Sequence, residues 1–331
     1  MDSRLNDTSV PLLVLDKALL AHMDITPQHV LNAVEMAYRG LGECLSDNPR
    51  KLMSEAFDGH SIAYSMLGRD GVRATVGFKT SYKHDPEKCR ETNNYYTTLL
   101  LFDDETGMPI ALMDGSLVGA LRTPAVSALL ARVSAPDART VLVVGTGTQG
   151  RMALPLLLAA LPKLERLIVH GHYESGIQAV RDQLQRFYPE RDIEVSSHLE
   201  AATRQADIVI GVAGKAVTET VHYTWLKPGA LAVLVGYGID KDVLYQASYR
   251  IATSTAQMQV TGQDLVDASG QLPIIDAELP DILLGRKAGR EKADQIVFAY
   301  NSGMVVTDIA LGRILAEQAR DKKLGQYISL W

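Results

Sequence analysis

Short apolar runs alternate with helical patterns over the second half of this chain. The runs lie at residues 141–144, 167–170, 206–212, 231–235, 250–253 and 296–299. Between them the apolar residues recur at helical spacing, as at Ile177, Val180 and Leu184, which fall on one face of a helix. Buried strands that alternate with helices predict an α/β fold with a doubly wound parallel sheet.

The first half of the chain has strand patterns without this alternation. Strand-like segments lie at residues 10–15, 62–67, 72–82, 95–102 and 110–113. The last two flank a turn with Gly107 and Pro109, which predicts an antiparallel hairpin. Thr26 followed by Pro27 predicts a helix start, with Thr as N-cap and Pro in the first helical position. Residues 83–91 are charged and are expected to form a solvated loop.

Residues 114–133 connect the two halves. Gly115 and Gly119 predict a flexible first part. Thr123 followed by Pro124 then predicts an N-cap and the start of a helix that leads into the strand at 141–144.

The chain has 331 residues, a length that suggests two domains. A long Ala-rich helix is predicted at 305–319, and it could return to pack on the front part of the chain. We therefore expect residues 1–120 with 305–331 to form an α+β domain for substrate binding and dimerisation, and residues 121–304 to form the parallel α/β domain.

The strand at 141–144 runs directly into a glycine-rich turn, since residues 141–152 read VLVVGTGTQGRM. Gly145, Gly147 and Gly150 thus follow a strand and precede a helix, which is the context of a Rossmann dinucleotide site. The first glycine permits the turn, the second lets the backbone approach a pyrophosphate, and the third lets the helix pack closely. The helix N-terminus then offers free N–H groups to the phosphates. Further cofactor contacts are expected at Thr146, Thr148 and Gln149.

Composition excludes several other classes of function. The net charge is −6 and 47% of the residues are hydrophobic, which is typical of a globular protein and gives no basic stripe for nucleic acid. Cys44 and Cys89 have neither disulfide-framework nor metal-ligand spacing. The longest apolar run, residues 152–161, is too short to cross a membrane, and the N-terminus lacks an apolar signal core. We expect a cytoplasmic protein without a bound metal.

The end of the second Rossmann strand lacks the acid that binds the ribose 2′-hydroxyl in many NAD-specific sites. The strand ends in LIVHGHYES, so Gly171 and His172 stand where Asp or Glu is common. Because no carboxylate would repel a 2′-phosphate, the sequence favours NADP(H) slightly over NAD(H), with His172 as a candidate phosphate contact.

Three cations in the front half could hold a substrate carboxylate, a role that arginine performs with two parallel hydrogen bonds. Arg50 lies in NPRKLM, Lys79 in the apolar strand TVGFKTSY, and Arg122 beside the expected helix start in ALRTPAV. Lys79 is the most informative, because a lysine in an apolar strand is costly unless it is paired or functional. A helix N-terminus would favour an anion next to Arg122.

Several motifs in this order resemble the ornithine cyclodeaminase/μ-crystallin family. Residues 103–131, DDETGMPIALMDGSLVGALRTPAVSALLA, are followed after a short gap by VLVVGTGTQG. The later segments ADIVIGVAG, WLKPGALAVLVG and SGMVVTDIALGRIL are also similar. The resemblance covers most of the chain. It implies a homodimer that binds NAD(H) or NADP(H) in a Rossmann domain, beside a discontinuous substrate domain made from the N-terminal half and the C-terminal helix.

The resemblance also implies roles for individual residues. Lys79 and Arg122 match the family's substrate-binding cations, and Arg50 matches a third. Thr123 belongs to the same motif as Arg122. The similar later segments extend the expected cofactor site to Val212, Gly236, Ser302 and Gly303.

The chain departs from the family at one acidic position. Members with cyclodeaminase activity have a catalytic Asp within a pattern like VGxDxPGxxEL, whereas this chain has the shorter VGYGIDKDVL. Gly238 falls at the position of that Asp, Asp240 lies two residues on, and Asp242 approximates the later acid. Asp240 is therefore a candidate catalytic acid, with Lys79 or a bound water as alternatives.

Reduction of an imino acid needs a carboxylate clamp, hydride geometry and one proton donor, whereas cyclodeamination needs a well-placed acid/base near Cα. We therefore expect an NAD(P)H-dependent oxidoreductase acting on the C–N bond of a small amino, imino or oxo acid. It would be an imine or ketimine reductase or an amino-acid dehydrogenase, with Lys79 as proton donor or carbonyl polariser. Two alternatives stay open: an ornithine- or lysine-type cyclodeaminase using catalytic NAD, and a non-catalytic NADP(H)-binding protein of the μ-crystallin kind.

Overall fold

The computed structural model describes residues 10–85 and 95–331. The chain divides into two compact units, each described by itself below. Unit 1 comprises Met1–Asp24, Cys44–Gly119 and Val305–Trp331, and unit 2 comprises Ile25–Glu43 and Ala120–Met304. The expected charged loop lies partly outside the described residues, from 86 to 91, and so does Cys89.

Unit 1 is built on a seven-stranded sheet in the order β15-β1-β6-β5-β4-β3-β2. Its strands are β1 (Pro11–Leu15), β2 (Leu52–Glu55), β3 (Ser61–Asp70), β4 (Thr75–His84), β5 (Tyr95–Asp103), β6 (Pro109–Asp114) and β15 (Gln326–Ser329). All neighbours run antiparallel except β1 and β6, and the hairpin expected between the two segments around Gly107 is β5–β6. A short helix, α1 (Lys17–Ala21), follows β1.

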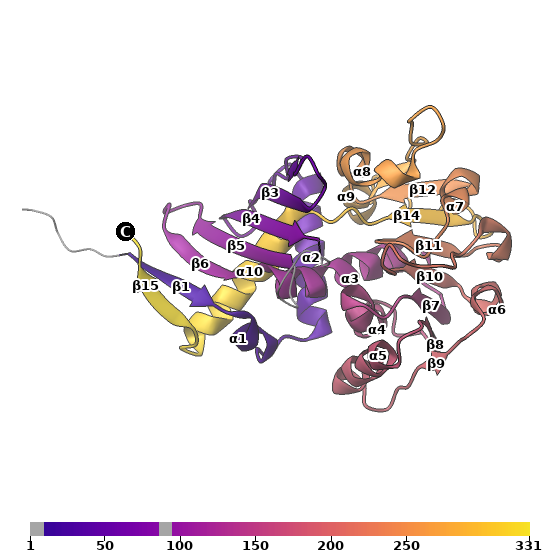
Figure 1. Ribbon diagram of the computed structural model, residues 1–331, viewed down its shortest axis with the longest axis horizontal. Helices are drawn as coiled ribbons and strands as arrows, with labels where there is room; N and C mark the ends of the chain where they lie inside the picture. Colours follow the sequence, from indigo (N-terminus) through magenta and orange to yellow (C-terminus); the bar gives the residue numbers. More distant parts are fainter. Residues whose placement is uncertain (1–9, 86–94) are drawn as a thin grey trace, which may run out of the picture. The chain divides into compact units, whose positions relative to one another are not determined.

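The long C-terminal helix α10 (Val305–Asp321) packs on one face of this sheet (Figure 1). Close approach requires glycine in the sheet, because a Cβ added at Gly77 would overlap the side chain of Ile309. Leu99 and Leu101 are fully buried on the same face. Helix α10 therefore packs on the front part of the chain and completes the core of unit 1, as predicted from the sequence.

The opposite face of the same sheet carries a row of apolar residues that is partly exposed among the described residues. The strand registers align Leu67, Phe78, Leu100, Leu112 and Val14 in one row across β3, β4, β5, β6 and β1. Leu67 and Phe78 are 46% and 42% exposed. Single exposed apolar residues are ordinary, whereas neighbouring exposed apolar residues on one face are less common on a monomer.

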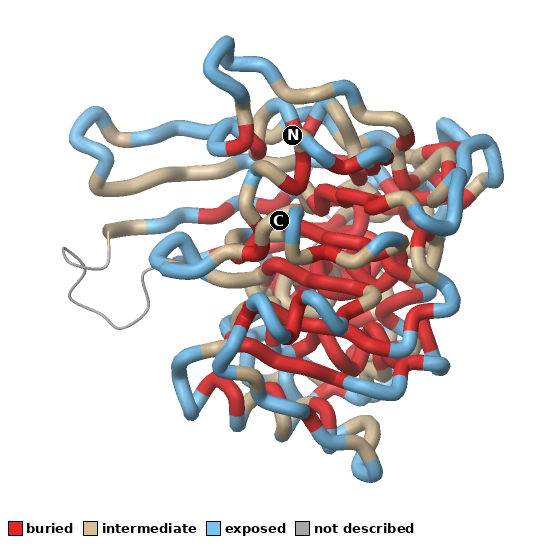
Figure 2. The backbone as a smooth tube through the Cα atoms, turned by 90° about the vertical axis from the view of Figure 1, so that its right-hand side faces the viewer, coloured by how far each residue is buried: buried red, intermediate tan, exposed pale blue. Residues whose placement is uncertain are grey.

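Unit 2 is built on an eight-stranded sheet in the order β13-β12-β14-β11-β10-β7-β8-β9, and every recorded pair is parallel. Its strands are β7 (Thr140–Val144), β8 (Arg166–His170), β9 (Glu194–Val195), β10 (Ile208–Gly211), β11 (Leu231–Leu234), β12 (Tyr249–Ala252), β13 (Ala277–Glu278) and β14 (Val297–Tyr300). Figure 2 shows buried strands in red, bordered by exposed loops in pale blue. The doubly wound sheet predicted from the alternating pattern is confirmed.

Helices cover both faces of this sheet, as in other doubly wound folds. The α-helices wholly within unit 2 are α2 (Pro27–Gly42), α4 (Thr148–Ala160), α5 (Glu174–Phe187), α6 (Leu199–Gln205), α7 (Lys241–Gln246), α8 (Thr255–Thr261) and α9 (Leu279–Leu283). Helix α3, described below, has residues in both units. Leu199, Val243 and Met258 bring α6, α7 and α8 into one core cluster with the strands.

Helix α2 is placed differently from the expected domain boundary. It starts as predicted, since the Thr26 hydroxyl accepts a hydrogen bond from His29 N at 3.3 Å. However, it packs on α4 and α9, within unit 2. Arg39 donates to Leu283 O at 2.7 Å, and Glu35 pairs with Arg132 at 2.6 Å. Its apolar face and these ion pairs attach residues 25–43 to the parallel unit.

The helix start expected at Thr123 and Pro124 is wrong. Helix α3 (Gly115–Ser134) is one continuous helix with Pro124 inside it. Asp114 supplies the cap, its Oδ1 accepting from Leu117 N at 2.9 Å. An internal proline costs about 3 kcal/mol, and burial of the residues that follow Pro124 offsets this cost. Arg122 consequently lies within the helix, so the argument from a helix N-terminus no longer applies to it.

Among the described residues α3 is also the one helix long and apolar enough to cross a membrane. Of its apolar window, 61% is buried within the structure, as expected of a core helix.

The cap at Asp114 can be tested directly. Asp114→Ala should lower the free energy of unfolding by about 1 kcal/mol, because the N–H of Leu117 loses its acceptor. Urea unfolding followed by circular dichroism measures the change. Asp114→Asn is the matched control and should stay within a few tenths of a kcal/mol, since Asn caps about equally well. Equal stability of all three proteins would contradict the assigned cap.

Candidate active site

The glycine turn after β7 has the geometry that the sequence predicted. Gly145 has φ +113°, and a Cβ there would lie 2.6 Å from Ala213 N. A Cβ at Gly150 would overlap Gly145 O, so the third glycine lets α4 pack against the turn. By contrast, no heavy atom lies within 4 Å of a Cβ built on Gly147. The second glycine thus borders open space, where another backbone or a phosphate can approach.

The start of α4 is suited to an anion. Its N-cap is Gly147, which has no side chain to bond the first N–H groups, including those of Thr148 and Gln149. Free N–H groups and the helix dipole both favour negative charge at this point. This turn fits a dinucleotide phosphate.

The end of β8 adjoins the glycine turn. A Cβ on Gly171 would lie 2.6 Å from the methyl group of Thr146, and one on Gly176 would overlap the Thr146 hydroxyl. Thr146 therefore occupies the space that an acidic side chain at position 171 would need. The His172 ring lies edge-on to that of His170, with centroids 5.3 Å apart.

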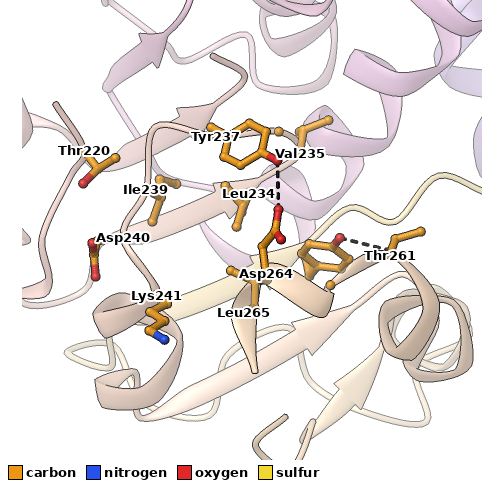
Figure 3. A pocket seen from close by; sticks show the side chains of 13 residues that line it. Thr220, Leu234, Val235, Tyr237, Ile239, Asp240, Lys241, Thr261, Asp264 and Leu265 are labelled. Carbon is orange, nitrogen blue, oxygen red and sulfur yellow. Dashed lines mark hydrogen bonds between the residues drawn. The ribbon is translucent and has the colours of Figure 1, made fainter. Parts of the chain in front are cut away.

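A pocket of about 430 Å³ opens at the carboxyl ends of β11 and β14. Gly236, Tyr237 and Asp240 are among its lining residues. Figure 3 shows Tyr237 directed toward Asp264, to which its hydroxyl donates at 2.9 Å. Burial, followed by this hydrogen bond, raises the pKa of Tyr237, so its hydroxyl remains a donor at neutral pH.

The loop that follows β11 explains why this chain has glycine at position 238, where cyclodeaminases of the family are expected to have Asp. Gly238 has φ +106°, and its Cβ would lie 3.0 Å from Val144 at the end of β7. A side chain at this position is therefore both strained and crowded. Asp240 instead caps α7, with Oδ1 accepting from Asp242 N at 2.9 Å, while it lines the pocket.

His222, Asp240 and Asp242 place three possible ligand atoms within 4.8 Å of one another. Asp242 accepts from Tyr223 N at 3.2 Å and lies 3.3 Å from His222 Nδ1. With the cap made by Asp240, these bonds account for the cluster as local structure at the start of α7.

In unit 1, Lys79 lies on the face of β4 that α10 covers. Its Nζ donates to Asp308 Oδ1 at 2.7 Å, with the lysine 5% exposed and the aspartate fully buried. A Cβ on Gly119 would lie 3.3 Å from Nζ, so glycine keeps space beside the ammonium. Lys79 is therefore held in one direction, and a side chain at position 119 would crowd its ammonium. The sequence did not assign Asp308, although an acid within the apolar stretch MVVTDIALG was the available signal.

In unit 2, Arg122 and the segment after β14 lie together. The guanidinium of Arg122 packs on Gly303, where a Cβ would lie 2.7 Å from Nη1 and where φ is +65°. Asn301 Nδ2 donates to Thr123 O at 3.0 Å, which ties this segment to α3. The Ser302 hydroxyl lies 2.6 Å from that of Thr253. Gly303 thus serves to support the arginine.

Val212 and Arg50, two further residues expected in the site, lie next to the glycine turn and before β2. Val212 directly follows β10, and its N–H donates to Val144 O at 2.9 Å, next to the glycine turn. Arg50 is exposed and precedes β2, two residues after Asn48, whose Oδ1 accepts from Val306 N at 3.0 Å. The first turn of α10 therefore contacts the segment that carries Arg50.

The sequence profile of the "Ornithine cyclodeaminase/mu-crystallin family" matches residues 14–323 of this chain. One curated relative, the N-((2S)-2-amino-2-carboxyethyl)-L-glutamate dehydrogenase of Staphylococcus aureus, is 26% identical over 270 residues, which cover 79% of this chain and 80% of that protein.

Two solved structures share the fold at low sequence identity. The Delta(1)-pyrroline-2-carboxylate reductase of Thermococcus litoralis, in complex with NADH and L-proline, has a TM-score of 0.81 at 20% identity, over 96% of this chain and 100% of that one. An archaeal alanine dehydrogenase dimer with bound NAD has a TM-score of 0.81 at 20% identity, over 97% and 100%. These likenesses confirm the fold.

The buried ion pair of unit 1 yields a prediction about stability. Asp308→Ala should lower the free energy of unfolding by about 3–5 kcal/mol, because the Lys79 ammonium would remain buried without its carboxylate. Guanidinium unfolding measures the change.

The double variant Lys79→Met with Asp308→Leu is the matched control. It should recover most of the loss, since apolar groups of similar size replace a buried pair at little cost. If the double variant is as unstable as Asp308→Ala, the pair is retained for stability rather than for chemistry.

Proposed function

We propose that this chain is an NAD(P)H-dependent oxidoreductase acting on the C–N bond of a small amino or imino acid. The chain belongs to the ornithine cyclodeaminase/mu-crystallin family. It would be an imine or ketimine reductase or an amino-acid dehydrogenase. The observation that carries the proposal is the buried ammonium of Lys79, held by Asp308 and flanked by Gly119, where a Cβ would crowd Nζ. A purely dinucleotide-binding protein has no need of such a group.

The comparisons support this reaction class. The Staphylococcus aureus relative is named as a dehydrogenase of an N-substituted glutamate, and the Thermococcus structure is a reductase of a cyclic imino acid with NADH and proline. Both substrates are small amino or imino acids. We carry over the class of substrate and not its identity.

In the proposed reaction, a reduced nicotinamide bound at the glycine turn would supply a hydride for the carbon of a C=N bond. Arg122, supported by Gly303, binds the substrate carboxylate, with Arg50 as a second cation. Lys79 holds a proton at Nζ and delivers it as the imine becomes an amine, so that one hydride and one proton are consumed. Asp308 fixes the direction of Nζ by accepting one of its hydrogens.

The cofactor is assigned to the glycine turn of unit 2. Gly145, Gly147 and Gly150 shape the turn, while Thr146, Thr148 and Gln149 complete it. Val212, Gly236, Ser302, Gly303 and Thr123 are retained as further contacts. Asp240 is retained as an alternative acid, although its capping bond ties it to α7.

Cyclodeamination is the weaker alternative. It requires an acid/base near Cα, and the position of the family's Asp is held here by Gly238, whose conformation disfavours any side chain.

Turnover tests the assignment of the cations. A panel of oxo acids with ammonia or small amines, together with cyclic imino acids, should reveal a substrate that consumes NADH or NADPH. Lys79→Ala and Arg122→Ala should each lower kcat/KM by about 100-fold or more, with cofactor affinity preserved. Lys83→Ala, an exposed lysine on the same strand, is the matched control and should keep full activity.

Two results would contradict the proposal. Full activity in either cation variant would reject the site. Release of ammonia from ornithine or lysine, with no net change in NADH, would instead identify a cyclodeaminase.

We also propose that the chain acts as a homodimer. The face of the unit 1 sheet opposite α10, which carries the apolar row, would pair with the same face of a second copy. The row through Leu67, Phe78 and Leu100 supports this, as does the archaeal alanine dehydrogenase, which is itself a dimer.

Light scattering tests the homodimer and should give twice the mass of the 36.1 kDa chain. Phe78→Asp should shift the protein to monomer with unchanged circular dichroism, while Thr80→Asp, an exposed position on the same strand outside the apolar row, should weaken the dimer less. A monomeric native protein would overturn the proposal.

A further inference from the structure

The end of β8, beside the glycine turn, is where Rossmann proteins bind the adenosine ribose. Here Gly145 N donates to His170 O at 2.9 Å, so the two segments touch. Position 171 cannot carry the usual acid, because Thr146 fills the space next to it. A carboxylate at this place must therefore come from a position other than 171.

Glu219 brings a carboxylate to this place. It lies in the exposed segment that follows β10, and its Oε2 is 3.8 Å from Nε2 of His170. The side chain of Glu219 is 46% exposed, whereas that of His170 is 5% exposed. Glu219 therefore remains accessible to a ligand, while its approach to His170 places the carboxylate at the carboxyl end of β8.

His170 adds a second hydrogen-bond acceptor. Its Nδ1 lies 2.9 Å from the carbonyl oxygen of Ser196, which can only accept, so Nδ1 carries the hydrogen. In the neutral ring, Nε2 then has a lone pair to offer. That atom is buried and has no hydrogen-bond partner among the described residues. A buried polar atom without a partner is costly, and a ligand hydroxyl would satisfy it.

We propose that Glu219 is the ribose-binding acid of this chain, with Nε2 of His170 as a second acceptor, and that the chain selects the dinucleotide whose 2′-hydroxyl is free. A ribose diol offers two O–H donors to two acceptors. A 2′-phosphate offers only acceptor oxygens and negative charge, which Glu219 repels. The proposal rests on the dinucleotide site of the proposed function. It reverses the slight preference for NADP(H) that the sequence suggested from the missing acid after β8.

Direct binding tests the inference without any substrate. NADH and NADPH are titrated into the full-length protein, and the dissociation constants are read from nicotinamide fluorescence or calorimetry. NADH should bind about tenfold tighter or more, as expected for a hydrogen bond to a charged acceptor. Glu219→Gln should weaken NADH binding and strengthen NADPH binding, and Glu219→Lys should reverse the preference.

The matched control is Glu190→Gln, which removes the same charge from an exposed position after α5, at the amino end of the sheet. It should leave both constants unchanged. Equal or tighter binding of NADPH by the native protein, or an unchanged ratio in Glu219→Gln, overturns the inference.

The outcomes also separate this inference from the proposed reaction. If neither dinucleotide binds, the cofactor site and this inference both fall. If NADH binds selectively through Glu219 but no amino or imino acid is turned over, the proposed reaction falls and this inference stands.

Discussion

A lysine ammonium and a fully buried carboxylate meet on the inner face of the antiparallel sheet, and much of unit 1 is arranged around them. Desolvating both charges costs several kcal/mol each, so the pair is tolerated only if its geometry is good. Lys79 must therefore face α10, which fixes the face of β4 and, through its register with β3 and β5, the faces of its neighbours. Gly68 and Gly77 let the helix approach closely enough for Asp308 to reach Nζ.

The same stretch of chain supports the cations of both units. Within residues 301–308, Gly303 packs under the guanidinium of Arg122 and Asp308 holds Lys79. Between them, Val306 N donates to Asn48, two residues before Arg50. Each contact lies within its own unit, yet all come from one short segment. Glycine is needed at position 303 because φ there is positive and a side chain would displace Arg122.

The sequence predicted the elements with strong periodicity and the turns with clear local chemistry. The alternating runs identified the parallel sheet, and Thr26 with Pro27 identified the start of α2. It was wrong about α3, since Thr123 with Pro124 has the local form of a helix start but sits inside a longer helix capped by Asp114. Local propensity there was overridden by burial.

What the sequence missed depends on contacts between residues far apart in the chain. Asp308 lies 229 positions from Lys79, and spacing within either motif gives no sign of the other. Glu219 likewise reaches the end of β8 from the segment after β10. The domain assignment of α2 was also beyond local patterns, because its apolar face shows that it packs without showing against what.

The position of β14 has a consequence for how the chain is made. This strand is the last of its sheet in sequence, yet it lies between β11 and β12. During synthesis the parallel sheet therefore stays split until β14 emerges from the ribosome, leaving two strand edges without partners. Unit 1 is completed later still, because α10 and β15 follow β14 in the chain. Both units are thus completed only after the elements up to β15 have been synthesised, and until then the unpaired strand edges stay exposed to aggregation.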